Sequence, residues 1–110
     1  MRGLQSFGFG RIHTAAEIHT NDDGNKFLQM VVEFEDRLLQ KSGKLYQQRV
    51  LFRSFDPLDQ ERCNDLTEDR YVVIDGLVDA VAEKSPTGWW YANPRVTGRI
   101  HQILDTDQHG

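Results

Sequence analysis

The sequence contains very little cysteine and no long apolar run. Cys63 is the only cysteine in 110 residues, which excludes an internal disulfide and any zinc site built on paired thiolates. The chain has no apolar segment like that of a signal peptide, and no stretch near the roughly 20 apolar residues of a membrane helix. We therefore expect a cytoplasmic protein that is neither exported nor held in a membrane.

Basic residues and recognisable catalytic groups are also scarce. Thirteen Lys and Arg stand against seventeen Asp and Glu, so the net charge of −4 does not by itself attract a polyanion, although a local basic groove still can. His13, His19, His101 and His109 lack the spacing of a metal site. The sequence shows no Ser-His-Asp order and no glycine-rich phosphate loop before a helix. We expect no metal, no cofactor and no enzymatic activity.

Apolar and aromatic side chains, by contrast, are plentiful. Hydrophobic residues make up 38% of the sequence and include six Phe, three Tyr and two Trp. Burying this much apolar surface can offset the entropy lost on folding. The chain length fits one domain. We expect that domain to span residues 1–104 and to be followed by a short polar tail, 105–110.

Alternating apolar residues predict strands in the first half of the chain. The run from Gly3 to Thr20 predicts a first strand, in which Gly8 and Gly10 indicate a bulge or a bend. A turn-forming segment, 21–25, leads into a second strand over residues 26–35. Apolar side chains recur in this second strand at the period of two and should point into the core: Leu28, Met30, Val32 and Phe34.

The second half predicts three more strands and one helix. After a polar loop, 35–44, we expect a third strand over residues 45–55. Asp56 before Pro57 is a typical helix start, so a short helix should follow and reach Leu66. Two further strands are expected over residues 71–82 and 89–104.

Within these elements, several residues carry specific expectations. Leu58, Cys63 and Leu66 should lie near one face of the helix, and the run 72–74 should be buried on both sides. Pro94 implies a sheet edge or a bulge. Five strands with one helix between the third and the fourth is the order of the five-stranded Greek-key barrel called the OB-fold. We therefore predict an all-β protein of that fold.

Four segments, in this order, resemble the family of bacterial single-stranded DNA-binding proteins across nearly the whole chain. They are Phe9-Gly10-Arg11-Ile12, Phe27-Leu28-Gln29-Met30-Val31-Val32, Gln48-Arg49-Val50-Leu51-Phe52 and Val72-Val73-Ile74-Asp75-Gly76. The resemblance implies that aromatic side chains stack on unpaired bases while Lys and Arg neutralise phosphates, with no catalytic group. It also implies assembly as a dimer or a tetramer.

The chain departs from the family pattern at three places. Gln47 stands where the family usually has a Trp, which removes one stacking residue, and Leu77 replaces a basic residue after the fourth-strand glycine. The acidic, Phe-ended tail of the family is absent from residues 104–110. This last difference puts the recruitment of replication and repair proteins in doubt.

Candidate nucleic-acid-binding residues follow from strand parity and from the resemblance. If Val50 and Phe52 point inward, the neighbouring odd-numbered positions face outward, and adjacent aromatic residues at the start of the last strand cannot all be buried in one core. The candidates are Phe9, Arg11, Lys41, Lys44, Arg49, Arg53, Phe55, Trp89, Trp90, Tyr91 and Arg95. The alternative is that these arginines and lysines are merely solvated and that a Trp packs under a loop.

Three functions remain open from the sequence. The first is sequence-tolerant binding of single-stranded DNA in replication, recombination or repair. The second is an OB-fold that uses the same surface to bind a protein partner as a subunit of a replication or repair assembly, which the net negative charge favours. The third is an RNA-binding module, because stacking does not read the 2′-hydroxyl.

Overall fold

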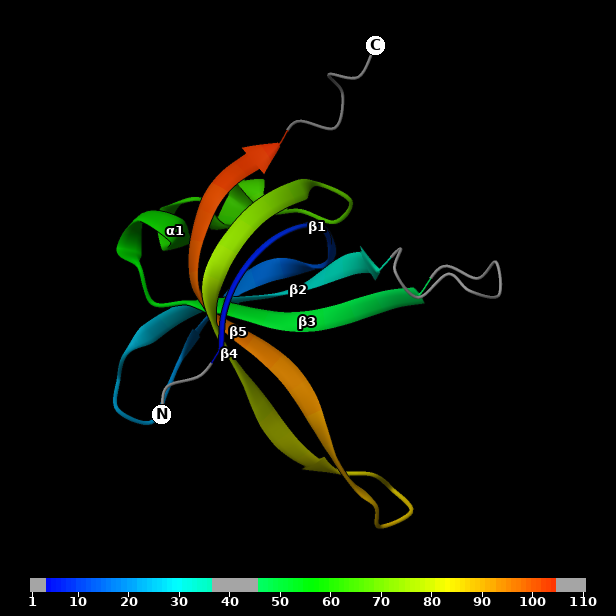
Figure 1. Ribbon diagram of the computed structural model, residues 1–110. Helices are drawn as coiled ribbons and strands as arrows, with labels where there is room; N and C mark the ends of the chain where they lie inside the picture. The colour runs from blue at the N-terminus through cyan, green and yellow to red at the C-terminus, as the bar shows by residue number, and fades with distance from the viewer. Residues whose placement is uncertain (1–3, 37–45, 105–110) are drawn as a thin grey trace.

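The computed structural model describes the backbone of residues 4–36 and 46–104, and the side chains of residues 8–34, 49–90 and 93–104. Its strands close into one barrel in the order β1-β2-β3-β5-β4, with β4 pairing back onto β1 (Figure 1). The elements are β1 (Leu4–Thr20), β2 (Lys26–Asp36), β3 (Tyr46–Ser54), α1 (Pro57–Glu61), the 3-10 turn η2 (Cys63–Asp65), β4 (Tyr71–Lys84) and β5 (Trp90–Leu104). This confirms the predicted all-β OB-fold with a helix between the third and fourth strands.

The β4–β5 hairpin extends well beyond the barrel. The last residue of β4 that pairs with β1 is Val78. Strand β5 pairs with β3 in parallel, and only over residues 95–97. Between these points the two strands pair with each other, up to Lys84 opposite Trp90. We call residues 79–94 the arm; it is the long hairpin that projects away from the barrel in Figure 1.

The core consists of the inward-facing residues of the strands. Leu28, Met30 and Val32 are fully buried and Phe34 packs against them half-buried, as the period of two predicts. Phe52 is likewise buried. The other core members are Ile12, Val50, Leu66, Val72, Ile74, Val96 and Ile100.

The expectation of burial on both sides of β4 is wrong for Val73. Its neighbours Val72 and Ile74 are buried, whereas Val73 is half-buried. A closed barrel has one core, so only one face of each strand can point into it. The outward face of β4 here lies beside Phe9 of β1.

The helical segment is shorter than predicted, and a different side chain is buried. Asp56 caps α1 as expected, since its carboxylate accepts a hydrogen bond from the Leu58 amide, but α1 ends at Glu61. Leu58 is 59% exposed whereas Leu66 is fully buried, so the predicted grouping of Leu58, Cys63 and Leu66 near one face is wrong for Leu58. The buried residue is instead Asp59, whose Oδ2 accepts hydrogen bonds from Ser54 Oγ at 2.6 Å and from the Ile100 amide at 3.1 Å.

Two pairs of strands approach closely where glycines occur. A Cβ at Gly98 would lie 1.8 Å from the carbonyl oxygen of Asp75 on β4, so no side chain fits there. On β1, a Cβ at Gly10 would lie 2.6 Å from a methyl group of Val32. The irregular pairing that the β1 glycines predicted comes later in the strand, between Ile12 and Glu17. Pro94 lies one residue before β5 begins to pair with β3, at a sheet edge as predicted.

Candidate nucleic-acid interface

A row of aromatic rings crosses the outer surface of the barrel from β1 to β3. The rings of Phe27 and Phe55 are 5.4 Å apart between centroids, and His19 stacks on Phe27 at 5.7 Å. The Arg53 guanidinium lies 5.4 Å from the centroid of the Phe55 ring. We call His19, Phe27 and Phe55 the aromatic row. Phe27 is half-buried and Phe55 exposed, so the row offers ring surface to solvent while the barrel fixes its position.

Arg53 connects the aromatic row to β5. Its Nε donates a hydrogen bond to the Thr97 hydroxyl at 2.8 Å, which ties the guanidinium to β5. Partial burial, and then the neighbouring charge of Arg95, lower the pKa of Arg53. Arg53 makes no ion pair within the part of the chain that the structure describes. It is therefore a positioned cation beside an aromatic ring.

Arg95 is paired with an acid of the arm. Its Nε and Nη2 reach both carboxylate oxygens of Asp79 at 2.9 and 2.6 Å. The hydrogen bond from Arg95 lowers the pKa of Asp79, and the same contact raises the pKa of Arg95. This bidentate pair spans β4 and β5 at the base of the arm, and it neutralises most of the charge that Arg95 brings to the surface.

Arg11 and Arg49 are held by a single buried carboxylate. Glu33 is only 6% exposed; its Oε1 accepts from Arg11 Nη2 at 2.8 Å and its Oε2 from Arg49 Nε at 3.0 Å. These two hydrogen bonds lower the pKa of Glu33. Arg11 also pairs with Asp69 at 2.9 Å. The side chain of Arg49 remains 60% exposed, so donors that do not face Glu33 stay accessible.

Both tryptophans are exposed at the tip of the arm. Trp89 is 76% and Trp90 69% exposed, so the expectation that an aromatic residue here faces outward is confirmed for both. Trp89 precedes β5 rather than opening it, because it belongs to the turn: its amide donates to Ser85 Oγ at 3.0 Å, and the Ser85 amide donates to its carbonyl at 2.7 Å. A glycine with a positive φ of 93°, Gly88, completes that turn.

Between the arm and the barrel lies a groove of about 270 Å³. Its barrel side is apolar at Val31 and Leu51, and its arm side is apolar at Val81 and Pro94. Its polar lining residues are Arg49, Glu83 and Asn93. The groove is thus an apolar slot with charged and amide groups around it, positioned between the face of β2 and β3 and the base of the arm.

The structure brings four of the eleven predicted residues together on the face formed by β3 and β5. Arg49, Arg53 and Arg95 surround the groove or adjoin it, and Phe55 belongs to the aromatic row. Phe9 is exposed but lies on the β1–β4 surface, edge-on to Tyr71 at 5.3 Å. Three predicted side chains lie outside the described ones: Lys41, Lys44 and Tyr91.

The sequence interpretation missed Phe27 and His19. Their contact depends on register, since Phe27 lies opposite His19 on β1, while the adjacent Leu28 lies opposite Ser54 on β3. The sequence was sufficient to predict that Phe27 faces outward, because its neighbour Leu28 was assigned to the core. What the sequence lacked was the pairing that puts this ring beside Phe55.

Comparison with known proteins supports the fold. A small single-stranded DNA-binding protein from Streptomyces coelicolor matches with a TM-score of 0.71 and 12% sequence identity, over 98% of this chain and 99% of the other. The SSB of Plasmodium falciparum, solved in complex with single-stranded DNA, matches with a TM-score of 0.71 and 12% identity, over 96% of this chain and 98% of the other. No protein-family model and no curated protein matches the sequence. Among the described residues, no helix has the length and apolar character needed to cross a membrane. The chain therefore has the fold of these two DNA-binding proteins, at an identity too low to carry more than the fold.

Proposed function

We propose that this protein binds single-stranded DNA with little sequence specificity and leaves it chemically unchanged. The observation that carries the proposal is the number of aromatic rings that the fold leaves accessible: the aromatic row on the barrel and two exposed tryptophans at the tip of the arm. Every base has a π-face, so such rings bind unpaired bases of any sequence. The fold shared with two single-stranded DNA-binding proteins supports the same function.

Stacking contributes more than charge in this proposal. Arg11, Arg49 and Arg95 each have a carboxylate partner, which leaves Arg53 as the cation of the face with no acidic partner among the described residues. Stacking on an aromatic side chain is worth about 1–3 kcal/mol per base. We therefore expect a shallow salt dependence, close to that of one or two phosphate contacts, each of which contributes a slope of about −0.7 in single strands.

The biological role that fits this chemistry is to protect or present unpaired strands during replication, recombination or repair. One barrel of this kind covers about 4–16 nucleotides. We propose that the protein assembles as a dimer or a tetramer, because linked sites on one strand gain affinity through their effective concentration. Such a function requires binding alone and no reacting group.

The rival function is a protein-interaction subunit that uses the same face. It is favoured by the net charge of −4 and by the carboxylate partners of most arginines on that face. Binding of RNA is a further alternative, because stacking does not distinguish the two sugars. All three can be separated by titration with defined strands.

The deciding experiment follows tryptophan fluorescence during titration with a pyrimidine DNA strand, the matching RNA strand and duplex DNA. Single-stranded DNA should quench the signal and bind more tightly than duplex, whose bases are already stacked. Trp89→Ala or Trp90→Ala should weaken binding by roughly 5- to 150-fold, the loss of one stacked base. Neither change should affect folding, because both rings are exposed.

Leu58→Ala is the matched control, since Leu58 is 59% exposed on α1, away from the groove. Its affinity should equal that of the unchanged protein. Absence of both quenching and binding at low salt, where phosphate attraction is strongest, would refute DNA binding and favour the protein-interaction function. Tighter binding of the RNA strand would reassign the ligand.

A further inference from the structure

A second cavity lies at the far end of the barrel from the arm. Its volume is about 550 Å³, and it is lined by Arg62, Asp65, Arg70, His101, Gln102 and Ile103. Figure 1 shows the helical segment and the end of β5, which form it, on the side of the barrel opposite the projecting arm. We call it the end cavity. It shares no lining residue with the groove beneath the arm.

The end cavity contains two arginines that have no carboxylate partner within the described residues. Elsewhere the described arginines are mostly paired with acids: Arg11, Arg49, Arg95 and Arg99. Arg70 is held by a hydrogen bond from its Nη1 to the Asp65 carbonyl at 3.0 Å, and Arg62 has no side-chain partner in the described part of the chain. In a chain with more acids than bases, two guanidiniums left unneutralised in one cavity favour an anionic ligand.

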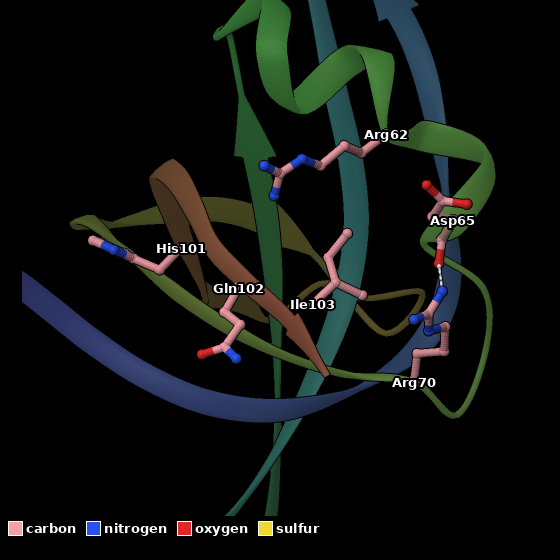
Figure 2. A pocket seen from close by; sticks show the side chains of 6 residues that line it. All are labelled: Arg62, Asp65, Arg70, His101, Gln102 and Ile103. Atoms are coloured by element: carbon pink, nitrogen blue, oxygen red, sulfur yellow. Dashed lines mark hydrogen bonds between the residues drawn. The ribbon is translucent and has the colours of Figure 1, made fainter. Parts of the chain in front are cut away.

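The directions of the side chains fit this interpretation. Figure 2 shows the Arg62 guanidinium extending away from the Asp65 carboxylate, toward the side where His101 and Gln102 lie. The acid of the cavity therefore does not neutralise Arg62. His101 pairs through Nε2 with Asp75 at 2.8 Å. Guanidinium groups are suited to phosphate because their N–H donors match two of its oxygens at once, and half-buried Ile103 adds an apolar surface beside them.

We infer that the end cavity binds a backbone phosphate of the same single strand after it has crossed the barrel face; this rests on the proposed function. Strand β5 links the two places, with Thr97 at the face and Gln102 in the cavity. At about 3.3 Å per residue, these two positions are roughly 17 Å apart along the strand. An oligonucleotide short enough to occupy the face alone should not reach the cavity, whereas a longer one should.

The test compares two lengths of oligodeoxythymidine: about 4 nucleotides, the lower limit of what one barrel face covers, and about 30 nucleotides, which exceeds it. Arg62→Ala, and the double change with Arg70→Ala, should leave the short strand's affinity unchanged. They should weaken the long strand by about two- to fivefold for each arginine, the range of an exposed ion pair. The salt slope for the long strand should fall by about 0.7 per lost contact.

Arg99→Ala is the matched control. Arg99 lies on β5, which ends at the cavity, but it is paired with Asp56 and does not line the end cavity. It should bind both lengths like the unchanged protein. Arg62→Ala removes no hydrogen bond made within the described residues, so a normal melting temperature is expected. The test therefore remains valid with Arg62→Ala alone even if the variant with both Arg62→Ala and Arg70→Ala is unstable.

Four results would overturn the inference. Equal affinity and equal salt slope of the variants and the unchanged protein for the long strand would refute the role of the cavity alone. Equal weakening of both lengths would mean that the arginines act on the main face. A titration with inorganic phosphate or thymidine monophosphate can be followed by the NMR signals of the arginine Nε–H groups. If either compound saturates the cavity while Arg62→Ala leaves long-strand binding unchanged, the ligand of the cavity is a free phosphate compound. If the unchanged protein binds neither length, the proposed function fails as well.

Discussion

Replacing Glu33 by Gln should strengthen DNA binding while it weakens the fold. Glu33 is a carboxylate 6% exposed beneath Arg11 and Arg49, and it accepts one hydrogen bond from each. Glutamine keeps the shape and one carbonyl acceptor but removes the negative charge. The two arginines then present their full charge to a strand that lies across the face. In the folded protein one arginine keeps a hydrogen bond to the amide oxygen, whereas the other loses its acceptor and faces the amide NH2 group.

The magnitude follows from Coulomb's law and counterion release. A unit negative charge about 6 Å from a phosphate weakens binding about threefold in water, and more in a partly dry groove. One nearby phosphate therefore gives an expected gain of about threefold, and two give about tenfold. If each freed arginine makes a phosphate contact, the salt slope should become steeper by about 0.7 per contact.

The assay is a titration with a pyrimidine strand at several salt concentrations, together with a thermal melt. Glu61→Gln is the matched control, since it makes the same change in net charge on exposed α1. It should alter neither the affinity nor the melting temperature appreciably. An unchanged or weaker affinity for Glu33→Gln would refute the reasoning, and would mean that Glu33 serves to aim the arginines rather than to mask them.

Three further predictions follow from the same structure. Because the pKa of Glu33 is lowered, its stabilising contribution is complete above the usual pKa of 4.5 and disappears as the pH falls through the lowered pKa. The melting temperature should therefore fall less on acidification in Glu33→Gln than in the unchanged protein, and an equal fall would contradict this. Asp59→Ala should cost about 1–3 kcal/mol in urea unfolding, because two buried donors lose their acceptor, and no loss would mean that water replaces the carboxylate. Phe27→Ala and Phe55→Ala should each weaken single-strand binding, with a double-mutant cycle that is non-additive because the rings touch; strict additivity would show that they bind separate bases.

Core positions were predictable because they depend on local periodicity. Leu28, Met30 and Val32 alternate at the strand period, and the same parity placed Val50 and Phe52 inside and Arg49 and Arg53 outside. The helix start was equally local, since Asp56 caps the amide two residues ahead. The order of five strands around one helix then indicated the barrel, and the structure agrees with it.

Periodicity was misleading where a polar side chain took an interior position. Leu58 was expected near the same helix face as Leu66, yet Leu58 is exposed and Asp59 is buried, because the Asp59 carboxylate satisfies donors of Ser54 and Ile100. Those two donors lie on β3 and β5, which are 5 and 41 residues away from Asp59 in the sequence. A pattern of apolar residues cannot reveal an acid that is buried to satisfy hydrogen bonds.

The sequence by itself determined which residues of β2 and β3 face inward, where the helix cap lies, and that aromatic residues remain on the surface. Only the tertiary structure decided which of them meet: Phe27 beside Phe55, Glu33 beneath two arginines, and Arg62 with Arg70 in one cavity. The physical reason is that strand parity is a property of neighbouring residues. The pairing of distant strands depends instead on register around the closed barrel, where a shift of one residue would exchange every such contact.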